Sequence, residues 1–179
     1  MTSLRTERLL LRPLRHNDFE HLQYALRPEF YRYFPIPEQT PQTIANWLEQ
    51  QLVEQPGGQT TWTFGIELLE VGHVIGTVRI TIQSRDHKAA DIGYALNSDF
   101  YGHGYATEAA RAVLNFGFCE LGMHRIWATA DVRNQPSWRV QERIGMKREG
   151  LLRQDKLIRG EWRDSYLYAA LKKDFTAAG

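Results

Sequence analysis

Cysteine is almost absent from this sequence, since Cys119 is the only one among 179 residues. A single thiol excludes a disulfide within the chain and a zinc site made of several thiolates. An unpaired cysteine is typical of proteins in a reducing compartment, so we expect a cytoplasmic location. The fold must then be stabilised by its core, and a chain of this length can bury a large one.

Long hydrophobic runs and an excess of one charge are also missing. No apolar run approaches the roughly 20 residues that a membrane-spanning helix needs. Lys and Arg number 22 against 21 for Asp and Glu, whereas nucleic-acid-binding proteins usually carry a clear basic excess. We therefore expect neither a membrane nor a nucleic acid as a direct partner.

Histidine is present, but its spacing does not suggest a metal site. No two histidines stand four residues apart in an expected helix, and no HExxH motif occurs. We therefore expect no bound metal.

The hydrophobic pattern predicts an irregular order of strands and helices. A helix capped by Asn17 or Asp18 follows a first short strand, and Thr40-Pro41 starts the next helix. The order is neither a regular βαβ alternation nor all-β, so we expect one α+β domain over 1–179, with helices flanking a largely antiparallel sheet. The further elements are strands at 61–68, 73–82, 88–96 and 125–132, helices at 106–121 and 136–144, and a hairpin of 147–158 with 161–171.

A glycine pair lies where a strand is expected to end and a helix to begin. Gly102 and Gly104 let the main chain approach a ligand closely, and the first turn of the helix leaves N–H groups free for an anion. A phosphate or pyrophosphate fits this arrangement. The dinucleotide-binding and Walker patterns fit less well, because Thr107 stands at the third glycine position and no Gly-Lys-Ser/Thr follows. A tight turn without any ligand stays open as an alternative.

The run around these glycines, YGHGYATEA at 101–109, resembles the acetyl-CoA pyrophosphate loop of the GNAT N-acetyltransferases. It is most similar to their ribosomal-protein N-terminal acetyltransferase-like branch, although Tyr101 replaces that branch's tryptophan. Segments 6–14, 91–94, 134–146 and 162–168 resemble the same branch in the same order, with Met146 in place of its phenylalanine. The resemblance implies the GNAT fold and transfer of an acetyl group from acetyl-CoA to a primary amine.

The resemblance also implies where acetyl-CoA binds. In this family the pantetheine arm enters a gap between the fourth and fifth strands and pairs with a strand edge. The main chain of the strand end, the N–H groups of the glycine loop and one side-chain amide are the implied contacts. These are Ala95, Leu96 and Asn97 for the arm, Gly102, His103, Gly104, Tyr105, Ala106 and Thr107 for the pyrophosphate, and Asn134 for the arm again.

Two residues are candidates for moving protons. The resemblance places Ser137 near the thioester sulfur, where it would protonate the leaving thiolate, and a tyrosine used by other acetyltransferases is replaced by Gln141. Asp91 could take the amine proton through a water molecule. Ser137 as a hydroxyl at a helix start, Asp91 as an ion-paired residue, and transfer by proximity alone stay open. An acyl-enzyme on Cys119 is disfavoured, because that residue falls near the far end of the expected helix.

The acceptor side is less well defined by the sequence. Tyr31, Tyr33 and Phe34 could form the rim of the acceptor pocket or belong to the core. Four residues of the expected hairpin could also face the acceptor: Arg153, Asp155, Trp162 and Asp164. A ribosomal-protein N-terminus, a polyamine and a small antibiotic-like amine all stay open as acceptors, as do monomer and homodimer. Another donor such as succinyl-CoA, or a non-catalytic CoA sensor, are the alternative functions.

Overall fold

The computed structural model describes residues 2–53 and 58–176, whose strands form one eight-stranded sheet. Its spatial order is β1-β2-β3-β4-β5-β6-β8-β7. β5 and β6 run parallel, whereas the other neighbouring strands of the described sheet are antiparallel. The predicted α+β class with a largely antiparallel sheet is confirmed. The strands are β1 (Leu4–Arg5), β2 (Leu9–Pro13), β3 (Thr61–Leu68), β4 (His73–Ser84), β5 (Ala89–Leu96), β6 (Arg125–Asp131), β7 (Lys147–Ile158) and β8 (Glu161–Leu171).

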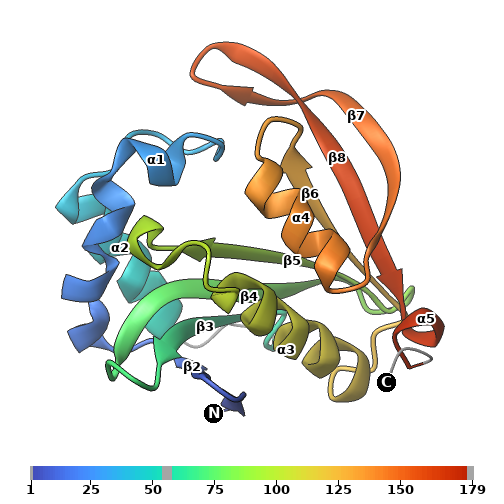
Figure 1. Cartoon of the computed structure of the whole chain (residues 1–179), viewed down its shortest axis with the longest axis horizontal. Helices are drawn as coiled ribbons and strands as arrows, with labels where there is room; N and C mark the ends of the chain where they lie inside the picture. Colours follow the sequence, from blue (N-terminus) through green and yellow to red (C-terminus); the bar gives the residue numbers. More distant parts are fainter. Residues whose placement is uncertain (1, 54–57, 177–179) are drawn as a thin grey trace.

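Helices cover both faces of this sheet. α3 (Tyr105–Cys119) and α4 (Gln135–Arg143) lie over one face, where Figure 1 shows them crossing in front of the strands. Phe64 and Ile66 point into that core, so Gly65 between them faces the other side, against Leu14 and Val74. η2 (Glu20–Leu26) and α2 (Pro41–Leu52) cover this second face only near the early strands. The shorter helices are η1 (His16–Asp18), α1 (Pro28–Tyr31), η3 (Ser98–Phe100) and α5 (Lys172–Thr176).

The helix expected after Asn17 or Asp18 is replaced by 3₁₀ turns, so that prediction is wrong. Asp18 is buried and its carboxylate receives two 2.8 Å hydrogen bonds from Arg12. Burial alone would raise the pKa of Asp18, but the bonds from Arg12 and the Arg15 amide lower it. The Asp18 carboxylate therefore accepts from Arg12 of β2 and from the preceding Arg15 N–H, and not from the first turn of a following helix. By contrast, α2 begins as predicted, since the Thr40 hydroxyl accepts the Thr43 N–H at 3.2 Å.

The β7–β8 hairpin reaches back to the first helices. Its turn, Arg159-Gly160, has φ angles of 50° and 78°, as two-residue hairpin turns require. The Arg159 guanidinium donates to the main-chain oxygens of Tyr31 (2.5 Å) and Arg32 (3.1 Å) and lies 4.8 Å from the centre of the Tyr31 ring. The tip of the hairpin is therefore joined to α1.

None of the helices in the described residues is long and apolar enough to cross a membrane.

Candidate active site

β5 and β6 part halfway along their length. Their register joins Ala89 to Arg125, Ala90 to Ile126 and Asp91 to Trp127. Within the described chain, no residue of β5 beyond Asp91 pairs with β6, and Figure 1 shows the two strands diverging. The main chain of β5 after Asp91 therefore has an edge that can pair with an extended, amide-containing ligand.

The loop after β5 presents unused N–H groups beside this gap. Gly102 and Gly104 have φ angles of +84° and +82°, a region that side chains disfavour, and Gly104 is the N-cap of α3. Among the hydrogen bonds of residues 2–53 and 58–176, none uses the main-chain N–H of 102–107. A Cβ on Gly102 would meet nothing within 4 Å, so the loop has room for a ligand. Together with the helix dipole, these groups suit an anion such as pyrophosphate.

Arg8 holds this loop from a distant part of the sequence, and sequence reasoning did not assign it to the site. Its Nη1 donates to the His103 oxygen at 2.9 Å, and its guanidinium lies 4.6 Å from the Tyr105 ring centre. Glu108 accepts from Arg8 Nε at 2.8 Å and from the Thr6 hydroxyl at 2.7 Å. Burial alone would raise the pKa of Glu108, but the bonds from Thr6 and Arg8 lower it, so the carboxylate stays ionised.

Replacing Arg8 with alanine is expected to loosen the glycine loop. The KM for acetyl-CoA should rise about threefold to tenfold while kcat stays within about twofold, because the loop is expected to bind the pyrophosphate and not to take part in the reaction. Lys147→Ala is a matched control, since it removes an exposed ion pair with Asp174 elsewhere. Steady-state kinetics on both variants test this. Equal KM values for the two would show that the loop keeps its shape without Arg8.

The loop and strand residues expected to bind acetyl-CoA lie around the gap. His103 stacks on Tyr105 with ring centres 5.6 Å apart, so both side chains shape the loop. Ala106 and Thr107 form the first turn of α3. The other three, Ala95, Leu96 and Asn97, lie at the end of β5.

Asn97 is already engaged within the chain. Its N–H donates to the Ile75 oxygen at 2.8 Å, and its C=O accepts from Phe100 at 3.0 Å. Its side-chain oxygen accepts from the Asp99 N–H and from Arg27. Main-chain groups alternate in direction along a strand, so those of Ala95 also point to β4, and Leu96 is the one of these three residues that turns its N–H and C=O toward the gap.

The start of α4 faces the same gap. Asn134 is the N-cap, and its side-chain oxygen accepts the Ser137 N–H at 3.4 Å. The Ser137 hydroxyl instead donates to the Tyr94 oxygen at 3.4 Å, while the Tyr94 hydroxyl donates to the Ser137 C=O at 2.7 Å. Asn134, not Ser137, therefore caps the helix. Within the described residues the buried Gln141 Oε1 has no hydrogen-bond partner.

Asp91 lies on the other face of β5. Strand residues alternate, so Asp91 and Tyr94, three positions apart, point to opposite sides of the sheet. The Asp91 carboxylate forms an ion pair with Arg79 at 2.9 Å and accepts from Gln83 at 2.5 Å. The structure thus places Ser137 on the helix side of the gap and Asp91 on the opposite side.

On this opposite face a groove of about 510 Å³ runs beside β6. Trp127, which pairs with Asp91 in the sheet, lies in its lining, so the groove leads to the place where β5 and β6 part. Of its lining, sequence reasoning had named only Asp155 as facing the acceptor, and the signal for the other residues is the polar and aromatic alternation of β6. Its lining residues are Arg125, Trp127, Thr129, Leu152, Asp155, Lys156 and Leu167.

The aromatic residues expected at the acceptor side differ in their exposure: Tyr31 is buried, whereas Tyr33 and Phe34 are partly exposed. Tyr31 is buried beneath Arg159, and its hydroxyl contacts Glu38 at 3.3 Å. Phe34 packs on Phe30 with ring centres 5.4 Å apart, and Tyr33 is partly exposed. Tyr31 therefore supports the joint between α1 and the hairpin.

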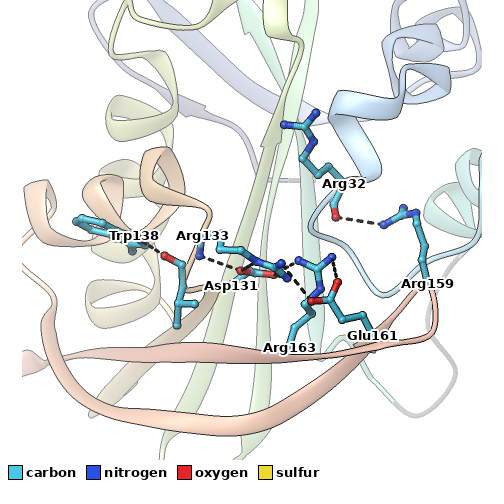
Figure 2. A network of polar contacts seen from close by, with 8 residues as sticks. Arg32, Asp131, Arg133, Trp138, Arg159, Glu161 and Arg163 are labelled. Atoms are coloured by element: carbon cyan, nitrogen blue, oxygen red, sulfur yellow. Dashed lines mark hydrogen bonds and ion pairs between the residues drawn. The ribbon is translucent and has the colours of Figure 1, made fainter.

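Figure 2 shows the contact of Arg159 with Arg32 and, apart from it, a polar network at the end of β6. Asp131 is buried and accepts the Arg133 N–H at 2.9 Å. Arg163 pairs with Glu161 at 2.7 Å, while its Nε has no partner among the described residues. The four side chains connect β6, β8 and the start of α4.

In residues 2–53 and 58–176, no three His, Cys, Asp or Glu side chains gather in a way that could hold a metal ion.

Comparisons with known proteins agree with this geometry. The family model of the acetyltransferase (GNAT) domain matches residues 8–147. The uncharacterized N-acetyltransferase p20 of Bacillus licheniformis is 31% identical over 98% of this chain and 99% of its own length. YdaF of Bacillus subtilis, to which ribosomal N-acetyltransferase activity is ascribed, is 34% identical over 62% of each chain. The crystal structure of a GNAT-family acetyltransferase from Bacillus anthracis superposes with a TM-score of 0.85 and 32% identity, covering 96% of this chain and 99% of that one.

Proposed function

The chain belongs to the GNAT acetyltransferase family and is an acetyl-CoA-dependent N-acetyltransferase, and we propose that it transfers the acetyl group directly to a primary amine in a ternary complex. One observation carries this proposal: the gap between β5 and β6 lies next to the start of α3, whose first main-chain N–H groups are unused. An extended thioester followed by a pyrophosphate fits that sequence of groups. We also propose that the whole chain acts as a single domain.

The residues around the gap fit acetyl-CoA in detail. Leu96 would offer its main-chain N–H and C=O at the free edge of β5 to the amides of the pantetheine arm, and Ala95 lies next to it with its main chain paired to β4. The Asn134 side-chain oxygen is occupied by Ser137, which leaves its NH₂ group as a donor for the arm. The loop from Gly102 to Thr107 would hold the pyrophosphate through main-chain N–H groups.

Direct transfer is favoured over an acyl-enzyme. Cys119 is the last residue of the 15-residue α3, whereas the glycine loop lies at its start. At 1.5 Å per residue the two ends of this helix are about 22 Å apart. A thiol at that distance cannot reach a thioester whose pyrophosphate is held at the other end.

The chemistry needs one proton to move from nitrogen to sulfur. The C–N bond forms, the C–S bond breaks, and the amine loses a proton while the thiolate gains one. We propose that Ser137 gives its proton to the sulfur and regains one from water. Asp91 would receive the nitrogen's proton through water on the opposite side of the gap.

Asp91→Asn is expected to lower kcat/KM more below pH 7 than at pH 9. An α-amino group has a pKa of about 7.7–8.0, so at low pH it is protonated and depends on a proton acceptor. A pH–rate profile measures this, with Gln83→Leu as the control that disturbs the same carboxylate without removing its charge. A loss of equal size at every pH would mean that Asp91 serves to hold Arg79.

The acceptor would approach along the groove beside β6, opposite the side on which acetyl-CoA is held. Trp127 in its lining suits a protonated amine through the indole ring, and the Asp155 carboxylate would exchange its ion pair with Lys156, at 3.1 Å, for the amine. A ribosomal-protein N-terminus is the first candidate, because of the activity ascribed to YdaF. Small amines are the second.

Release of free thiol from acetyl-CoA tests the function directly. The probes are hexapeptides beginning with serine or alanine, spermidine and kanamycin, each compared with a reaction without amine. Amine-dependent thiol release supports the proposal. Faster release from succinyl-CoA would reassign the donor, and acetyl-CoA binding without turnover on any probe would favour a non-catalytic sensor.

A further inference from the structure

Tyr94 crosses the gap between the parted strands. It lies in β5, three residues beyond Asp91, where pairing with β6 ends. Its hydroxyl reaches the first turn of α4 and donates to the Ser137 C=O at 2.7 Å. The open stretch of β5 is thus connected to the helix that carries Ser137.

The direction of each hydrogen bond in this pair is determined by the phenol. Burial raises the pKa of Tyr94 to about 12, although bonds with Ser137 and Gln141 oppose the shift. Tyr94 therefore keeps its proton near neutral pH and gives it to the Ser137 C=O. Toward the Ser137 hydroxyl, which lies 3.4 Å away, the Tyr94 oxygen is therefore the acceptor and not the donor.

This contact orients Ser137 without holding it firmly. A hydroxyl–hydroxyl distance of 3.4 Å is long, since such bonds are usually 2.7–2.8 Å, so it is easily exchanged for a stronger acceptor. A thiolate is negatively charged and forms stronger hydrogen bonds than a neutral phenol. The Ser137 hydroxyl can therefore donate its hydrogen bond to Tyr94 before the reaction. It can then turn that hydrogen bond toward the sulfur when the C–S bond breaks.

We propose that Tyr94 is a positioning residue for acetyl transfer, which holds the start of α4 through the Ser137 C=O and orients the Ser137 hydroxyl beside the reacting thioester. The proposal rests on the proposed function, because Tyr94 acts only through Ser137. It assigns to β5 the phenol that other acetyltransferases place on the helix, where this chain has Gln141. Tyr94 keeps its own proton throughout.

A double-mutant cycle tests the proposal. Tyr94→Phe, Ser137→Ala and the double variant are assayed by thiol release, with the peptide, spermidine or kanamycin probe that the wild type acetylates fastest. Tyr94→Phe should lower kcat about fivefold and leave the KM for acetyl-CoA within about twofold. The double variant should have the kcat of Ser137→Ala alone, because the phenol has nothing left to position.

Tyr168→Phe is the matched control. Tyr168 is buried and its hydroxyl also bonds to α4, but at Glu142 (3.0 Å), away from Ser137. Its kcat should equal that of the wild type, and thermal melting of both Phe variants shows that each is folded at the assay temperature.

Three results would overturn the proposal. They are an unchanged kcat in Tyr94→Phe, equal losses in both Phe variants, and independent effects that multiply in the double variant. A wild type that releases no thiol with any probe would instead reject the proposed function, and this is seen before any variant is made.

Discussion

Gly104→Val is expected to weaken acetyl-CoA binding at least about tenfold, or about 1.4 kcal/mol. Gly104 has a φ of +82°, which a β-branched side chain rarely adopts. The loop would relax toward negative φ, and the N–H groups after it would turn away from the pyrophosphate. The fold itself has space for the side chain, since a Cβ there meets only Arg8 Nη2 at 3.6 Å.

Gly122→Val separates this effect from general strain. Gly122 also has a positive φ, +68°, and open space around it, but it follows α3 at the far end from the loop. Titration calorimetry with acetyl-CoA and thermal melting should show similar losses of stability in both variants and a loss of affinity only in Gly104→Val. Normal affinity in a folded Gly104→Val would reject the loop as the pyrophosphate site.

Local sequence signals predicted most of the fold. The hairpin of 147–158 and 161–171 has its predicted limits. The reason is that Gly160 readily adopts the positive φ that the turn at Arg159-Gly160 requires. Thr40-Pro41 likewise marks the start of α2. The segment after Asp18 could not be predicted in the same way. Its conformation depends on the buried pair with Arg12, a contact that no periodicity reveals.

The candidate site was predictable only where its residues are close in sequence. The glycine loop and the Asn134–Ser137 turn each lie within one short motif. The contacts that hold them join distant segments, as Arg8 with Glu108 and Tyr94 with Ser137 do. Such pairs depend on which strands become neighbours, so their chemistry becomes visible only once the sheet is assembled.

Ser137→Ala is expected to lower kcat about 10–100-fold and to leave the KM for acetyl-CoA within about threefold. General acid catalysis typically contributes about 10²–10⁴-fold, and this case should fall at or below the lower end. The reason is the leaving group: a thiol with a pKa near that of free cysteine, about 8.5, departs readily without help. Steady-state kinetics with the peptide probes measure both constants.

Thermal stability decides between catalysis and capping at Ser137. An N-cap hydroxyl contributes about 1 kcal/mol, but in this structure the cap is Asn134, and the Ser137 hydroxyl points to Tyr94. Ser137→Ala should therefore melt close to the wild type, whereas Asn134→Ala should lose about 1 kcal/mol of stability. Measuring kcat and melting on the same preparation separates the two effects. A stable Ser137→Ala variant with full kcat would remove Ser137 from the reaction and leave solvent as the proton source for the sulfur.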